Sequence, residues 1–95
     1  MEIIWTLTAK NSFKSNIKYL LEDWTYREVV NFTNEVYKKL DLIALHPNMG
    51  LFDGELKCNK YVILKQITLL YSIDGNTIYL LNFWNNYRKP LKKML

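Results

Sequence analysis

The sequence predicts an α+β fold in which a helical hairpin packs on a mainly antiparallel sheet. Apolar residues recur every three to four positions over residues 9–45, and they largely alternate with polar ones over residues 60–84. A third, shorter alternating stretch precedes the helices. With 95 residues, of which 49% are hydrophobic and 23% charged, the chain has room for one core, so we expect residues 1–95 to form one domain.

The predicted element order is strand–helix–helix–strand–strand–strand, beginning with residues 3–8. These residues alternate in polarity and are rich in β-branched side chains, which is typical of a strand. From residue 9 the spacing changes to that of an amphipathic helix that continues to residue 24. Its apolar face is formed by Ala9, Phe13, Ile17, Leu20, Leu21 and Trp24, and its charged face by Lys10, Lys14, Lys18 and Glu22.

A capping box marks the start of the second helix. The Thr25 hydroxyl can accept a hydrogen bond from the Glu28 N–H, while the Glu28 carboxylate reaches back to the Thr25 N–H. The helix is expected over residues 25–45, because Pro47 moves His46 out of the helical conformation. The short junction between the two helices predicts an antiparallel hairpin.

Strands are expected in hairpin succession after the helices. Residues 50–59 are mixed in character and are assigned to a loop with room for one short strand. The strand-like stretch at residues 60–73 covers 14 positions, well beyond the usual ~5–6 of a strand. A turn is therefore placed at residues 64–67, which divides the stretch into two strands.

The last hairpin is marked by its turn. Asp74-Gly75-Asn76 is a good hairpin sequence, and residues 78–84 form the strand that follows it. The tail from about residue 85 is basic, and Pro90 keeps it out of a central strand.

Charge is distributed unevenly along the chain. Residues 1–56 carry six basic and eight acidic side chains, whereas residues 57–95 carry seven basic ones and one acidic one. The basic second half favours an acidic partner, either a nucleic acid or an acidic protein segment.

Composition excludes several classes of site. One cysteine, Cys58, and one histidine, His46, cannot form an intramolecular disulfide or a Cys/His zinc site, and we expect no metal or cofactor. No apolar run approaches the roughly 20 residues of a bilayer span, so no membrane partner is expected. The first residues lack the basic region of a signal peptide, and the predicted location is the cytoplasm.

Several short segments occur in an order and spacing that one known family shares. They are Trp5 and Ala9 at the start of the first helix, Trp24 at the junction, Pro47-x-x-Gly50 after the second helix, strand segments at residues 61–63, 67–73 and 76–81, and Arg88 two positions before Pro90. Over about residues 3–92 the chain resembles the RelE/ParE family, the toxins of type II toxin–antitoxin modules.

The resemblance implies a bacterial cytoplasmic toxin that a cognate antitoxin protein neutralises, in a toxin–antitoxin hetero-oligomer. In this family an antitoxin segment docks in the groove between the sheet and the helices. Some members cut messenger RNA on the ribosome, whereas ParE-like members poison DNA gyrase. The family alone does not choose between these targets.

The RNA-cleaving branch implies a cluster of cations on the sheet and a proton carrier near the C-terminus. Relatives commonly carry an arginine at or near the place of Thr68, which supplies no charge. Arg88 keeps the usual position two residues before Pro90, and Tyr87 occupies the place of another arginine. Arg88 and Tyr87 are therefore the candidate catalytic residues. The set of cations that the RNA-cleaving branch uses is incomplete here, because Thr68 carries no charge.

The basic residues of the second half are candidate contacts to a nucleic acid or another acidic target: Lys57, Lys60, Lys65, Arg88, Lys89, Lys92 and Lys93. Glu55 and His46 are further candidate proton carriers. Each also has a structural interpretation. Lysines near strands protect edges or lie in turns, Glu55 is a solvated loop charge, and His46 caps a helix C-terminus.

Phe83 and Trp84 form the candidate partner patch. They are adjacent in a strand, so their side chains point to opposite faces, and one of them is expected to be exposed or covered by a partner. Cys58 is expected to be a small buried residue. The aromatic side chains expected in the core are Trp5, Phe13, Trp24, Phe32 and Tyr71.

Three functions are compatible with these features. The first is a ParE-like toxin that binds an essential target such as DNA gyrase and performs no chemistry of its own. The second is a ribosome-dependent mRNA endonuclease with a rearranged set of cations. The third is a non-toxic relative that retains antitoxin binding. The missing arginine at Thr68 favours the first.

Overall fold

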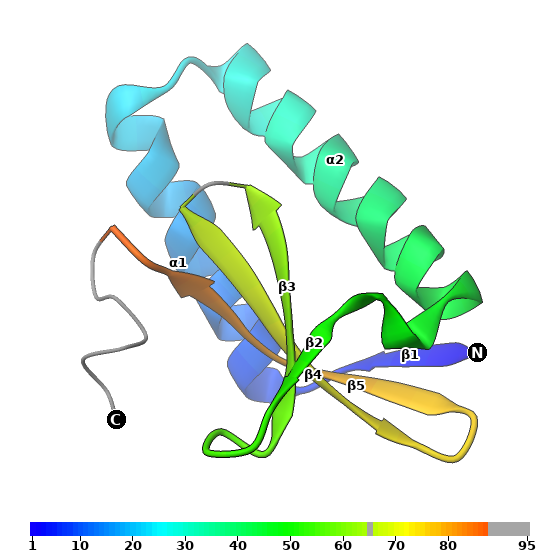
Figure 1. Cartoon of the computed structure of the whole chain (residues 1–95). Helices are drawn as coiled ribbons and strands as arrows, with labels where there is room; N and C mark the ends of the chain where they lie inside the picture. The colour runs from blue at the N-terminus through cyan, green and yellow to red at the C-terminus, as the bar shows by residue number, and fades with distance from the viewer. Residues whose placement is uncertain (65, 88–95) are drawn as a thin grey trace.

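The computed structural model describes residues 1–64 and 66–87 of the chain. Two long helices follow a short first strand, and four further strands complete the fold (Figure 1). The elements are β1 (Glu2–Trp5), α1 (Leu7–Asp23), α2 (Tyr26–Leu45), the short 3₁₀ helix η1 (Pro47–Met49), β2 (Leu51–Asp53), β3 (Cys58–Leu64), β4 (Ile67–Asp74) and β5 (Thr77–Asn85).

The strands form one five-stranded sheet in the order β1-β5-β4-β3-β2. β1 runs parallel to β5, and every other neighbouring pair is antiparallel. The predicted α+β fold is therefore confirmed. The loop expected at residues 50–59 contains the short strand β2, so the sheet has one strand more than the predicted order. No helix in the described residues is long and apolar enough to cross a bilayer.

The first strand is shorter than predicted, because Thr6 caps the helix that follows it. The Thr6 hydroxyl accepts a hydrogen bond from the Ala9 N–H at 3.1 Å and donates one to the Leu80 carbonyl at 2.6 Å. The first bond satisfies a free amide of the first helical turn, and the second ties the cap to β5. The strand predicted over residues 3–8 thus ends at Trp5, and α1 begins two residues before the predicted Ala9.

The predicted capping box starts α2. The Glu28 N–H donates to the Thr25 hydroxyl at 3.2 Å, and the Thr25 N–H donates to the Glu28 carboxylate at 3.1 Å. At the other end, His46 is the C-cap and its N–H donates to the Leu42 carbonyl, after which Pro47 opens η1. The helix bounds therefore agree with the sequence prediction.

A bulge in β5 changes which side chains face the core. Leu70 of β4 pairs with Asn82, but the next residue, Tyr71, pairs with Leu80, so Leu81 is the extra residue. An extra residue in one strand reverses the alternation of its side chains beyond that point. As a result Leu80 and Phe83, three positions apart, both point into the core.

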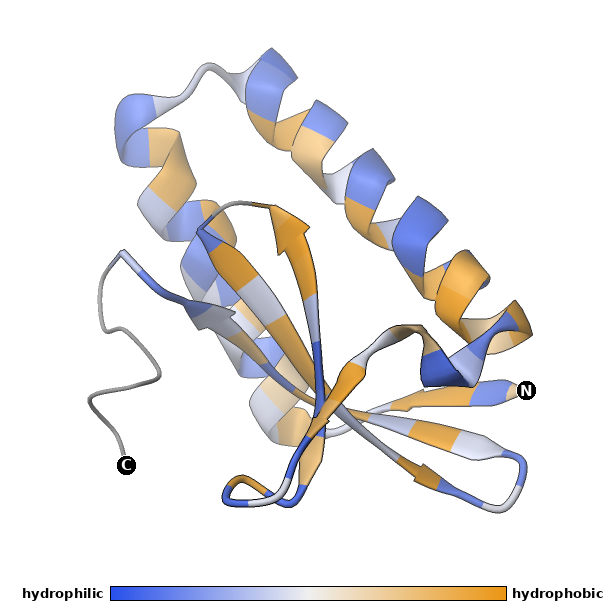
Figure 2. Cartoon of the chain, viewed as in Figure 1, coloured by the Kyte–Doolittle hydropathy of each residue, from blue (hydrophilic) through white to orange (hydrophobic). Residues whose placement is uncertain are grey.

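The core lies between the helix pair and one face of the sheet. The buried apolar side chains of both helices belong to this core. Figure 2 shows apolar and polar residues alternating in colour along both helices. The face predicted for α1 is partly wrong, because Leu21 is exposed and Asn16 is buried in the helix surface that meets β5. The expected core aromatics are confirmed, since Tyr71 and Phe32 are buried and Trp5, Phe13 and Trp24 pack against the core.

Candidate functional site

The face of the sheet turned away from the helices is the one that the helices leave uncovered, and the predicted cations of the sheet can be compared with it. Directly paired residues of neighbouring strands point to the same face. Across β3, β4 and β5 this pairing forms two rows on that face, Lys60–Leu70–Asn82 and Val62–Thr68–Trp84. Lys60 carries the one charge in these two rows.

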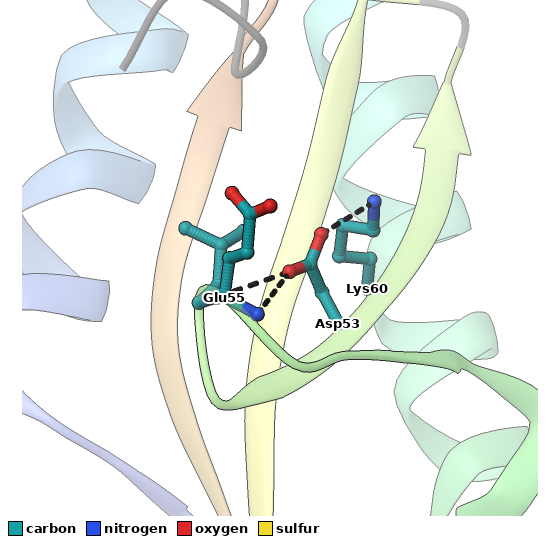
Figure 3. A network of polar contacts seen from close by, with 4 residues as sticks. Asp53, Glu55 and Lys60 are labelled. Carbon is teal, nitrogen blue, oxygen red and sulfur yellow. Dashed lines mark hydrogen bonds and ion pairs between the residues drawn. The ribbon is translucent and has the colours of Figure 1, made fainter. Parts of the chain in front are cut away.

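The charge of Lys60 is neutralised by an acidic residue of the neighbouring strand. Its ammonium lies 3.0 Å from the Asp53 carboxylate (Figure 3). The other oxygen of Asp53 accepts hydrogen bonds from the backbone N–H groups of Glu55 at 2.9 Å and Leu56 at 3.0 Å. Asp53 therefore closes the β2–β3 turn and holds Lys60 at the same time.

These contacts favour the ionised carboxylate. The Leu56 N–H and the Lys60 ammonium hold the pKa of Asp53 below its ordinary value, and the Glu55 N–H contributes in the same direction. At neutral pH the carboxylate is charged, so Lys60 already has a counterion. A phosphate that approached Lys60 would therefore meet the Asp53 carboxylate 3.0 Å from the ammonium.

Thr68, at the position where the family resemblance places an arginine, is a buried hydrogen-bonded side chain. It is 4% exposed, and its hydroxyl accepts a hydrogen bond from the Asn86 side-chain amide at 2.8 Å. This position supplies no charge and little accessible surface. A phosphate at this point of the sheet would find no cation from β4 among the described residues.

The structure places the other candidate residues on separate segments. Lys57 is exposed in the β2–β3 turn with a φ of 57°, and Glu55 is exposed in the same turn. His46 lies at the end of α2, and its N–H caps the helix as described above. Tyr87 follows β5 and is 63% exposed. Within residues 1–64 and 66–87, no hydrogen bond or ion pair joins the side chains of Glu55, His46 and Tyr87 into a catalytic cluster.

The remaining predicted contacts to nucleic acid or target lie outside the described residues. They are Lys65, Arg88, Lys89, Lys92 and Lys93. Their roles stay predictions from the sequence.

Of the two residues in the predicted partner patch, Phe83 is buried, so the prediction is wrong for this residue. Phe83 and Trp84 point to opposite faces, as expected, but Phe83 is 2% exposed and belongs to the core. Its ring lies 5.3 Å from that of Trp5 and 5.2 Å from that of Phe13, between ring centroids. The partly exposed Trp84 is on the face away from the helices. Phe83 therefore offers no surface to a partner.

A groove between the two helices is lined mainly by apolar side chains. It has a volume of about 430 Å³ and is lined by Trp5, Lys10, Phe13, Lys14, Ile17 and Tyr37. Four of the six lining side chains are aromatic or aliphatic, and the two charged ones are both positive. The sequence placed Trp5 and Phe13 in the core, and they do pack there, but one side of each also lines this groove.

A second, polar hollow of about 360 Å³ lies beside the last part of β5, lined by Ser12, Ser15, Asn16 and residues 82–85. β1 pairs with β5 only as far as Leu80, and α1 covers the edge beyond it. The Phe83 N–H donates to the Ser12 hydroxyl at 2.9 Å, and the Asn16 amide donates to the Phe83 carbonyl at 2.8 Å. The sequence analysis did not single out Asn16. The one sign that it is buried is its place next to Ile17, on the side of α1 that carries apolar residues.

Cys58, the one cysteine of the sequence, lies at the start of β3. Cys58 is buried, and burial raises the pKa of its thiol, with the Asp53 charge acting in the same direction. Within the described part of the chain, histidine, cysteine, aspartate and glutamate side chains form no group of three or more that could hold a metal ion.

Comparisons with known proteins find similarity in structure and none in sequence. No family model matches the sequence, and no curated protein matches it. A solved structure described as a chromosomal ParDE TA system from P. aeruginosa superposes with a TM-score of 0.75 at 9% identity, covering 90% of this chain and 95% of the other. A YoeB/ParE toxin from Agrobacterium tumefaciens superposes with a TM-score of 0.63 at 12% identity, covering 90% and 98%.

At these identities the superpositions show a shared fold. The chain has the fold of these two structures, the ParDE one and the YoeB/ParE one, over nearly the whole length of each chain compared. The fold that the sequence resemblance implied is therefore confirmed.

Proposed function

We propose that this chain is the toxin component of a type II toxin–antitoxin module. In this proposal it acts as a ParE-like toxin that binds an essential cytoplasmic target such as DNA gyrase, and a cognate antitoxin neutralises it. The shared fold supports a toxin, and the sheet face supports a mode of action by binding.

The pairing of Lys60 with Asp53 is the observation that carries the proposal. Cleavage of RNA needs cations aimed at the place where charge develops on the phosphate. In the described rows of the sheet face Lys60 is held by Asp53 at 3.0 Å, and Thr68 is uncharged and buried. The mRNA endonuclease alternative therefore depends on residues beyond these rows, above all Arg88 and Lys65.

The helix groove supports an acidic, apolar antitoxin segment as the partner. Trp5, Phe13, Ile17 and Tyr37 offer it apolar contact area, and Lys10 and Lys14 offer it two positive charges. A segment that carries leucine-like side chains on one side and carboxylates on the other satisfies both.

Growth of a bacterial host tests the toxin and its target together. The chain is expressed from an inducible promoter, alone and with the neighbouring small reading frame. Purified protein is added to a gyrase supercoiling assay, and primer extension is run on a reporter messenger. We expect growth arrest that the neighbour relieves, loss of supercoiling, and no new messenger ends.

Two other outcomes separate the alternatives. New messenger ends at codons, lost in Arg88→Ala but kept in a Lys18→Ala control on the far side of α1, would establish the endonuclease instead. Absence of arrest, together with binding to the neighbouring protein, would establish the non-toxic relative.

A further inference from the structure

A third hollow lies where the end of β3 meets the first half of α2. It has a volume of about 260 Å³, and we call it the junction hollow. Figure 1 shows the end of β3 and the α1–α2 connection at the same end of the molecule. The residues that line the hollow are Trp24, Glu28, Asn31, Phe32, Glu35 and Leu64.

The junction hollow combines apolar side chains with acidic ones. Trp24, Phe32 and Leu64 belong to the core or pack against it, and part of each also lines the hollow. The two charged lining residues, Glu28 and Glu35, are both acidic. The hollow therefore suits an occupant that carries both apolar side chains and positive charges.

The two carboxylates keep much of their charge available. Glu28 accepts hydrogen bonds from the Thr25 N–H at 3.1 Å and the Thr25 hydroxyl at 3.2 Å, which are uncharged donors. Glu35 lies 3.8 Å from the Lys39 ammonium, which also donates to the Ile63 carbonyl at 2.5 Å. Among the described residues no ion pair involves Glu28, and the ion pair of Glu35 is long and shared.

The chain around the hollow is acidic, although the protein as a whole has a net charge of +4. Residues 22–35 carry four acidic side chains and one basic one. Residues 88–95, which we call the basic segment, carry four basic side chains and no acidic one. Leu91, Met94 and Leu95 stand among these cations. The basic segment therefore has both kinds of side chain that the hollow suits.

The basic segment begins close to the hollow. Ile67 of β4 pairs with Leu64 on one side and with Asn85 on the other, so Leu64 and Asn85 are two strand spacings, about 10 Å, apart. The Asn86 N–H donates to the Gln66 carbonyl at 2.7 Å, which keeps the chain beside the β3–β4 turn beyond β5. The basic segment has eight residues, which span up to about 26–29 Å when extended. It is therefore long enough to reach the hollow.

We propose that the basic segment docks in the junction hollow of the same chain. Its apolar side chains contact Trp24 and Phe32, and its cations lie beside Glu28 and Glu35. The covalent connection favours this segment over a separate basic peptide, because a short flexible connection gives an effective concentration in the millimolar range. This proposal does not depend on the toxin function proposed above.

Docking affects how the basic segment meets an acidic target. Its four cations, Arg88, Lys89, Lys92 and Lys93, are predicted contacts to a nucleic acid or another acidic target. When the segment is docked, such a target competes for these cations with the carboxylates of the hollow. The junction hollow then acts as an intramolecular competitor that weakens binding of the target.

NMR spectroscopy of the full chain tests the proposal. We expect nuclear Overhauser contacts between the methyl groups of the basic segment and the rings of Trp24 and Phe32. Lys92→Gln combined with Lys93→Gln should reduce their intensity by about half or more, because it removes two of the four cations. About 1 M salt should weaken the contacts in the parent chain, since it shortens the screening length to about 3 Å.

The matched control is Lys10→Gln combined with Lys14→Gln. It changes the net charge by the same amount, but both lysines are exposed on the first half of α1 and outside the junction hollow. This variant should keep the contacts of the parent chain. Glu35→Lys tests the other partner and should weaken the contacts, because it replaces a negative charge of the hollow by a positive one. The amide spectrum of each variant checks that it is folded.

A mixed sample of isotope-labelled and unlabelled protein distinguishes the segment of the same chain from that of a second copy. Contacts between labelled and unlabelled chains that grow with concentration would assign the segment to a neighbouring molecule and overturn the proposal. It would also be overturned by equal losses in the two lysine variants. Absence of contacts from the basic segment to Trp24 and Phe32 at about 50 mM salt, where screening is weak, would do the same.

Discussion

The Asn16 side chain of α1 donates a hydrogen bond to the Phe83 carbonyl of β5 across 2.8 Å, although the two residues are 67 positions apart. Together with Ser12, Asn16 supplies the contacts that a neighbouring strand would give to the edge of β5 beyond Leu80. The same amide also donates to the Ser12 carbonyl, so both of its hydrogens are used. This part of the sheet edge is therefore closed by a helix.

Asn16→Ala should destabilise the fold by about 1–3 kcal/mol, because it leaves the Phe83 carbonyl without this donor at a buried position. Chemical denaturation measures the change as a loss in the free energy of unfolding. Asn11→Ala is the control, since Asn11 is exposed on the same helix. Equal losses in the two variants would show that the contact with Phe83 is unimportant.

Gly50→Ala should be destabilising by about 1–3 kcal/mol through a steric clash. A Cβ at this position would lie 2.5 Å from the Tyr71 hydroxyl and 2.9 Å from the Lys60 carbonyl, both of which are held by the core and the sheet. Gly54→Ala is the matched control, because a Cβ there meets nothing within 4 Å. Thermal melts compare the two, and a Gly50→Ala protein as stable as the control would contradict the geometry.

The Asp53 carboxylate should make stability depend on pH in the acidic range. Its pKa in the folded state is lowered by the Leu56 N–H and Lys60, from an ordinary value of 3.8. The contribution is therefore fully present above that value and is lost as the pH falls below it, through the folded pKa. Denaturation as a function of pH should show a weaker acid dependence in Asp53→Asn. An NMR titration of the Asp53 carboxyl carbon that showed an unshifted or raised pKa would refute this.

Charge reversal in the helix groove should disable the antitoxin and spare the fold. Lys10→Glu combined with Lys14→Glu replaces both positive charges of the groove, so an acidic antitoxin segment should bind at least about tenfold more weakly. Isothermal titration with the purified antitoxin gives the affinity. Lys18→Glu, an exposed change on the same helix outside the groove, should bind normally. Unchanged affinity in the double variant would place the antitoxin elsewhere.

Local signals predicted the helices and the main turns well. The capping box at Thr25 and the stop at Pro47 gave the bounds of α2, and Asp74-Gly75-Asn76 located the β4–β5 turn, where Gly75 has a φ of 59°. Each of these is an interaction or a steric effect among residues within about four positions. Because the residues involved are close together in the chain, such interactions can be recognised from the sequence alone.

Predictions that required a partner from another element were less accurate. Leu21 was expected to be buried and is exposed, because α1 turns Asn16 toward β5. Phe83 was expected to share a partner patch with Trp84, but the extra residue Leu81 shifts β5 and brings Phe83 into the core. Neither the edge that Asn16 closes nor the bulge is marked in the local sequence.

The sequence by itself determined the α+β fold class, the helical hairpin and the order of the main strands, since periodicity and caps depend on near neighbours. Only the tertiary structure decided which charged side chains have an ion-pair partner and which edges of the sheet are covered. Lys60 is paired because β2 brings Asp53 beside it. The outer edge of β2 is open because β2 ends the sheet, and the β5 edge beyond Leu80 is closed by α1. These outcomes depend on strand register and helix placement, which arise when distant segments pack around one core.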